Sequence, residues 1–143
     1  MNQSATETFE LKPHHCGISV PDIEASIKWY SDVLGFSVAK RIEFGAGKIA
    51  FMKQGDFYIE LFEIPDSRPS VDSQTDMGQD LSIQGTKHIA LMVDDLAKFA
   101  DYLKKRGVNI PRGVREGEES PRALFIRDNS GIMLEFVPPT APD

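Results

Sequence analysis

Polar and apolar residues alternate along residues 12–20, which predicts a β-strand with two different faces. Downstream, apolar residues recur at the spacing of an amphipathic helix, which Asp22 can cap and Gly35 can end. The strand carries His15, Gly17 and Ser19 on one face and Cys16, Ile18 and Val20 on the other, and the apolar stripe of the helix consists of Ile23, Ile27, Tyr30 and Leu34.

Three further strands are predicted after this helix, at residues 37–44, 48–53 and 57–63. Gln54 and Gly55 form the predicted tight turn between the last two. The first half of the chain is therefore a β-α-β-β-β unit.

The second half repeats this order. A strand at 88–93 precedes a helix that Asp94 or Asp95 can cap and Gly107 can end. We expect three more strands near 109–114, 122–127 and 132–137, with a turn at residues 128–131. The inward positions of the second helix are Leu96, Phe99, Ala100 and Leu103.

The two halves also match residue by residue. The stretch from His15 to Asp22 aligns with the stretch from His88 to Asp95, 73 positions later. A glutamate flanked by apolar residues follows each histidine, after 45 positions at Glu60 and 47 positions at Glu135. This internal repeat predicts two copies of one unit packed about a pseudo-twofold axis.

The repeat sets the expected organisation: a flexible N-terminal arm over 1–11, a single domain over 12–137 and a C-terminal tail over 138–143. Within the domain, module one covers 12–63 and module two covers 87–137. The segment 64–86 between them is polar and rich in turn-forming residues, so it is either a plain linker or a functional loop. Residues 113–121 form a second candidate loop.

Composition narrows the class of protein. The net charge is −6 and no basic stripe appears, so we expect no nucleic-acid partner. No apolar run reaches the length of a membrane span, and the N-terminus lacks the features of a secretion signal. One cysteine excludes an internal disulfide. We therefore expect a cytoplasmic protein.

The four repeated residues are predicted to lie on the sheet faces that point away from the helices. Strand alternation places His15, Glu60, His88 and Glu135 opposite the apolar sets that would pack under the helices. A carboxylate buried on such a strand without a partner is destabilising by several kcal/mol, and a divalent cation removes that penalty. Two imidazoles and two carboxylates suit Zn, Ni, Co, Mn or Fe(II). We predict one such metal ion per site, although a degenerate site that only binds is the alternative.

His14 competes with His15 for the role of first ligand, but both the repeat and the strand alternation favour His15. Cys16 falls on the face toward the helix and is interpreted as a small core residue.

These features resemble the vicinal oxygen chelate superfamily, which includes glyoxalase I, methylmalonyl-CoA epimerase, extradiol dioxygenases and the fosfomycin and bleomycin resistance proteins. The resemblance covers residues 13–137, and its most specific stretches are 15–36 and 125–136. It implies an α+β fold in which two tandem βαβββ modules form an open, U-shaped mixed sheet around a central cavity. It also implies His15, Glu60, His88 and Glu135 as metal ligands, and a substrate whose carbonyl or neighbouring oxygens chelate the metal.

The ligand set is closest to that of glyoxalase I, since the epimerase typically has glutamine at the place of Glu60. The resemblance then implies a lyase or isomerase that enolises a small carbonyl substrate, with Glu135 or Glu60 as the base. In an epimerase-like site Glu43 would be the second base, and the alternative for Glu43 is a solvent-facing strand residue beside Arg41. The four arginines available for an anionic substrate tail are Arg68, Arg112, Arg115 and Arg122.

Two other classes of function stay open: an Fe(II) extradiol-type dioxygenase and a non-catalytic drug- or metabolite-binding protein. Some relatives build each site within one chain and others across a dimer, and a homodimer is expected in either case.

Overall fold

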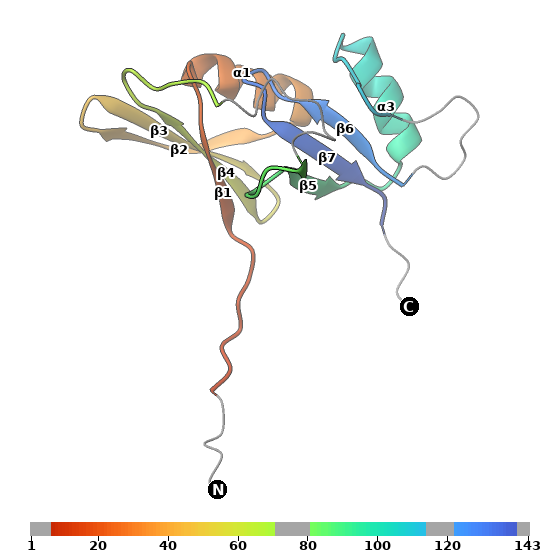
Figure 1. Ribbon diagram of the computed structural model, residues 1–143, viewed down its shortest axis with the longest axis horizontal. Coiled ribbons are helices and arrows are strands. Elements are labelled where there is room, and N and C mark those ends of the chain that lie inside the picture. The colour runs from red at the N-terminus through yellow and green to blue at the C-terminus, as the bar shows by residue number, and fades with distance from the viewer. Residues whose placement is uncertain (1–6, 71–80, 114–121, 140–143) are drawn as a thin grey trace, which may run out of the picture.

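The computed structural model describes residues 7–70, 81–113 and 122–139. Two sheets lie side by side, with both helices above them in the view of Figure 1. The elements of module one are β1 (His15–Ser19), α1 (Ile23–Leu34), β2 (Ser37–Phe44), β3 (Gly47–Gln54) and β4 (Phe57–Glu63). Those of module two are β5 (Ile89–Met92), α3 (Leu96–Lys105), β6 (Leu124–Arg127) and β7 (Met133–Val137).

Module one forms a four-stranded sheet in the order β1-β4-β3-β2. Strand β1 runs parallel to β4, and the other two pairs are antiparallel. In this register Glu60 lies between Gly17 on one side and Phe51 on the other. The β-α-β-β-β order predicted for the first half is thus confirmed.

Module two forms a separate three-stranded sheet in the order β5-β7-β6, with Glu135 between Ala90 and Phe125. The strand expected at 109–114 is wrong for its described part, where a single bridge joins Arg112 to Phe125. Pro111 explains the difference, because a proline has no backbone N–H to give to a strand ladder. Val114 lies outside the described residues.

Aspartates begin both helices, as predicted. The side chain of Asp22 accepts a hydrogen bond from the Ala25 backbone at 3.1 Å, and that of Asp95 accepts one from Lys98 at 3.0 Å. Helix α1 ends at Gly35, which adopts the left-handed conformation with φ 74°. The predicted stripe is buried: Ile23, Ile27, Tyr30 and Leu34 in α1, and Leu96, Ala100 and Leu103 in α3, while Phe99 is half-buried.

A single core joins the two modules beneath the helices. The strands contribute the apolar face that the sequence predicted, including Ile18, Ile59, Leu61, Leu134 and Phe136. The opposite faces of the two sheets carry the histidines and glutamates. The fold is therefore α+β with open sheets. The helices leave uncovered the sheet faces that carry the histidines and glutamates.

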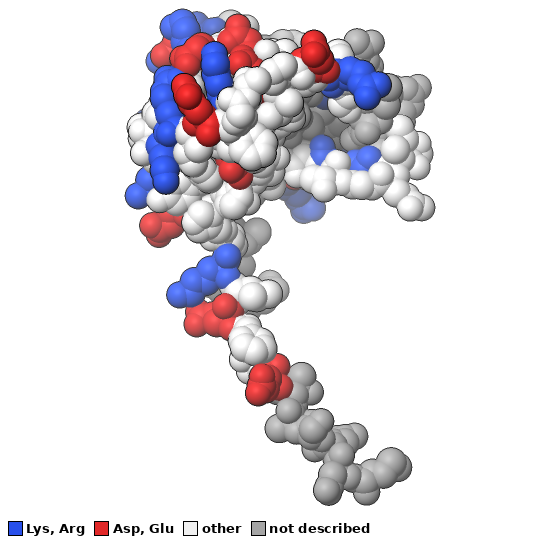
Figure 2. All heavy atoms as spheres, turned by 90° about the vertical axis from the view of Figure 1, so that its left-hand side faces the viewer, with Lys and Arg blue, Asp and Glu red and all other residues white. Residues whose placement is uncertain are grey.

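The first described residues extend away from the body of the protein, as Figures 1 and 2 both show. Phe9 and Leu11 are highly exposed there. On the face seen in Figure 2, basic and acidic side chains are interspersed and form no continuous basic patch. Within the described residues no helix is long and apolar enough to cross a membrane. Most of the predicted loop 113–121 and residues 71–80 of the segment 64–86 lie outside the described part.

Candidate metal centre

The first predicted pair of ligands meets on the open face of the first sheet. The Nε2 atom of His15 lies 3.1 Å from Oε2 of Glu60, and the glutamate is largely buried. Gly17 stands beside Glu60 on the neighbouring strand, and a Cβ atom added there would lie 3.2 Å from the Phe62 ring. The absence of a side chain at Gly17 thus leaves room for Glu60 and Phe62 to pack.

The second pair repeats this geometry. His88 precedes β5, and its Nε2 atom lies 2.6 Å from Oε2 of Glu135 on β7. Ala90, the residue beside Glu135 on β5, is small like Gly17 in module one. The sequence repeat therefore becomes a structural repeat of one His–Glu pair per module.

Two phenylalanines complete the pairs, and the sequence analysis missed them. Phe51 lies beside Glu60 and places its ring edge-on to His15, with ring centroids 5.9 Å apart. Phe125 does the same for Glu135 and His88, at 5.6 Å. A detectable signal existed, because a phenylalanine precedes each glutamate by nine or ten positions. These rings form apolar walls that hold the imidazoles in place.

His14 lies next to the first pair. Its Nδ1 atom is 2.7 Å from Nδ1 of His15, and its ring stacks on Tyr58 with centroids 5.3 Å apart. The contact with Glu60 is made by His15. The choice of His15 as the first ligand stays a prediction.

Glu43 lies on the other face of the first sheet. It is paired with Lys48 in the β2–β3 register and borders a pocket with Glu24 and Arg41. Arg41 donates two hydrogen bonds to Glu24 of α1 and thereby lowers the pKa of that carboxyl. Since residues two apart on a strand share a face, Glu43 points with Arg41 toward the helix side, away from Glu60.

The four predicted ligands form two pairs and not one cluster within a chain. In the described ranges, no group of three or more His, Cys, Asp or Glu side chains is placed to hold a metal ion. Each pair alone fits two neighbouring coordination positions, because donors about 2.1 Å from a metal and at right angles lie roughly 3 Å apart. Imidazole nitrogen and carboxylate oxygen are also suitable donors for the predicted metals. Each module thus carries one of the two His–Glu pairs.

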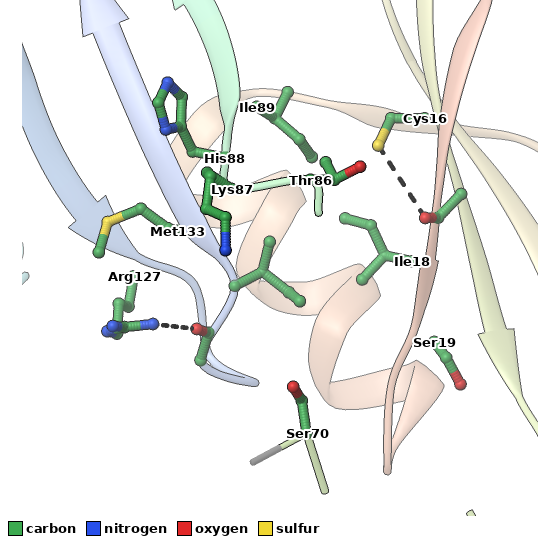
Figure 3. Close-up of a pocket in the computed structure, with 13 residues that line it drawn as sticks. Cys16, Ile18, Ser19, Ser70, Thr86, Lys87, His88, Ile89, Arg127 and Met133 are labelled. Carbon is green, nitrogen blue, oxygen red and sulfur yellow. Dashed lines mark hydrogen bonds between the residues drawn. The ribbon is translucent and has the colours of Figure 1, made fainter. Parts of the chain in front are cut away.

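A pocket of about 280 Å³ lies between the modules, bordered by β1, β5 and the β6–β7 turn (Figure 3). Ile18, Ile89 and Ile132 give it apolar walls, and His88 reaches its rim. Cys16 also lines this pocket, and burial raises the pKa of its thiol. Cys16 packs against the core as predicted.

Comparison with known proteins identifies the kind of fold. The sequence profile of the Glyoxalase/Bleomycin resistance protein/Dioxygenase superfamily matches residues 12–136. Lactoylglutathione lyase of Haemophilus influenzae is 29% identical over 127 residues, which cover 86% of this chain and 89% of the relative. The mitochondrial methylmalonyl-CoA epimerase of Mus musculus is 24% identical over 141 residues, covering 94% and 77%. The structure of Leishmania major glyoxalase I superposes with a TM-score of 0.70 at 21% identity, covering 90% of this chain and 87% of that one.

Proposed function

Because the chain belongs to the Glyoxalase/Bleomycin resistance protein/Dioxygenase superfamily, we propose that it is a metal-dependent lyase or isomerase of the glyoxalase I kind. Its substrate is a small carbonyl compound with neighbouring oxygens. The observation that carries this proposal is the pair of matching His–Glu contacts, His15 with Glu60 and His88 with Glu135. The similarity to lactoylglutathione lyase supports the same class of reaction.

In this proposal a second copy of the chain completes each site. One chain supplies His15 and Glu60, and its partner supplies His88 and Glu135. Two observations support this arrangement: the pairs lie on separate sheets, and the open sheet faces carry exposed apolar side chains. Phe44 and Met92 are 63% and 68% exposed on the faces that hold the pairs. A partner that covers these faces would remove that apolar surface from water.

The chemistry follows from the donor set. A bound divalent metal would supply a Lewis acid that stabilises negative charge on the carbonyl oxygen as the neighbouring carbon loses a proton. Glu135 or Glu60 takes this proton and returns it to the adjacent carbon, as a carboxylate general base can. Phe51 and Phe125 pack against the imidazoles and restrict their orientation. Glu43 faces the helix side, so it has no role in this proposal.

An epimerase acting on an acyl-CoA thioester is the second candidate, and the similarity to the mouse epimerase favours it. It uses the same proton abstraction next to a carbonyl. Assays with an α-oxo thiohemiacetal and with an acyl-CoA distinguish the two, since each predicts turnover of one substrate class.

The test is elemental analysis of the purified protein beside the Glu60→Gln, Glu135→Gln double variant. We expect about one Ni, Co, Zn or Mn ion per chain in the wild type and loss of the metal in the variant. Stoichiometric iron with oxygen consumption would favour a dioxygenase instead. A protein that binds no metal even after reconstitution would contradict the proposal and indicate a binding protein.

A further inference from the structure

In the first half of the candidate metal centre, the neighbouring residues His14 and His15 contact each other through their rings. The two Nδ1 atoms lie 2.7 Å apart, so one ring donates the hydrogen bond and the other accepts it. We propose that His14 is a positioning residue that orients the His15 imidazole for metal binding. This inference rests on the function proposed above.

The fold itself does not require a histidine at this place. The repeat sets Lys87 at the position equivalent to His14, and a lysine ammonium has no acceptor atom for such a bond. His14 is also exposed, so its ring does not fill the core. Its backbone carbonyl accepts a hydrogen bond from the Tyr58 N–H at 3.1 Å, and any residue at this position would keep that bond. The fold therefore does not require the imidazole of His14, which contacts His15.

The contacts of His15 define what His14 does. Nε2 of His15 faces Glu60 at 3.1 Å and its Nδ1 faces Nδ1 of His14 at 2.7 Å, so each ring nitrogen of His15 has a partner. A metal bound at Nε2 requires the tautomer in which Nδ1–H of His15 donates to His14. The stacking of His14 on Tyr58 holds the His14 ring in place beside His15.

Two substitutions separate the hydrogen bond from the stacking. His14→Phe keeps an aromatic ring against Tyr58 but removes the partner of His15. His14→Asn loses the stacking but returns a polar atom to the place of Nδ1, and its amide can donate or accept. Tyr58→Leu is the matched control, because it removes the stacking partner and leaves the His14–His15 bond possible.

The measurement is metal affinity by competition with a chelator, together with the visible absorption spectrum of the cobalt-loaded protein. We expect His14→Phe to weaken affinity by about 10- to 100-fold and to change the cobalt spectrum. His14→Asn should restore most of the affinity, and Tyr58→Leu should have a smaller effect than His14→Phe. Thermal unfolding of the metal-free proteins should be the same for wild type and His14→Phe.

The outcomes separate this inference from the proposed function. A wild type that binds metal and a His14→Phe variant with equal affinity and an unchanged cobalt spectrum would overturn the role of His14 alone. The same holds if His14→Asn binds as weakly as His14→Phe. A wild type that binds no metal would overturn the proposed function, and the positioning role with it.

Discussion

Asp128 is the one buried charged side chain in the described part of the protein, and it is only 6% exposed. Its carboxylate accepts hydrogen bonds from the Tyr30 hydroxyl at 2.6 Å, from the Ser130 N–H and hydroxyl, and from the Ile132 N–H. The carboxylate can be buried here because both of its oxygens accept hydrogen bonds. The network explains why the turn after β6 has the sequence Asp-Asn-Ser-Gly.

Replacing Tyr30 with phenylalanine removes the donor that reaches Asp128 from α1. We expect the free energy of unfolding to fall by about 1–3 kcal/mol, because a buried acceptor is left with one hydrogen bond fewer. Denaturant unfolding measures the change. Tyr102→Phe is the control. The Tyr102 hydroxyl donates to the Val33 carbonyl at a part-buried position, so its loss should lower the free energy of unfolding by less.

The stability that Tyr30 contributes also depends on pH, and Tyr30→Phe should remove that dependence. Burial, and then the charge of Asp128, raise the pKa of Tyr30 above its ordinary value of 10.0. The unfolded state therefore loses the phenolic proton at lower pH than the folded state. The contribution of Tyr30 to the free energy of unfolding is therefore complete below about pH 10. It declines above that pH, by up to about 1.4 kcal/mol per pH unit. Unfolding at several alkaline pH values should show a shallower decline in Tyr30→Phe; an equal slope would contradict the assignment.

The sequence repeat was sufficient to single out the residues of the two His–Glu pairs, and their role as metal ligands stays a prediction. His15, Glu60, His88 and Glu135 were recognisable because charged or imidazole side chains recur on apolar strands. Phe51 and Phe125 were missed because a phenylalanine on a strand is ordinarily a core residue. The His14–His15 contact depends on ring orientation, which alternation along a strand does not specify.

At the scale of elements, the paired helix caps give a direct test of the repeat. Asp22→Ala and Asp95→Ala should each lower the free energy of unfolding by about 0.5–2 kcal/mol, because each removes the acceptor for a first-turn N–H group. Asp94→Ala is the neighbouring control, as the sequence left Asp94 and Asp95 both open as caps. It should change stability by less than about 0.5 kcal/mol. A larger loss in Asp94→Ala than in Asp95→Ala would contradict the cap assignment.

Most elements followed from the sequence because their signals agree with one another. In α1, the capping aspartate, the apolar stripe and the terminal glycine all indicate one helix, and the predicted ends match the observed ones. The predicted strand at 109–114 is wrong for its described part, because Pro111 has no backbone N–H for a strand ladder. The division into two sheets was also not predictable. It depends on whether the edge strands of the two modules pair, and tertiary packing decides this.

At the scale of the whole molecule, the proposed site between two chains predicts complementation. A variant without the module-one ligands (His15→Ala, Glu60→Ala) and one without the module-two ligands (His88→Ala, Glu135→Ala) should each bind no metal. Mixed and allowed to exchange subunits, they should recover about one quarter of the wild-type metal, because half of the dimers hold one intact site. Metal analysis of the mixture is the measurement. Recovery of none, with exchange shown by mass, would mean that each site forms within one chain.

The bond between Tyr30 and Asp128 has a consequence for how this duplicated chain can change. Its donor belongs to module one and its acceptor to module two, and Tyr102 of module two donates in return to the backbone of α1. Each half now carries a polar group that the other half must satisfy. The two halves also share one core, so they depend on each other for stability. A fragment that contains only one half should therefore be less stable than the whole chain, since it would expose its share of that core and lose these bonds.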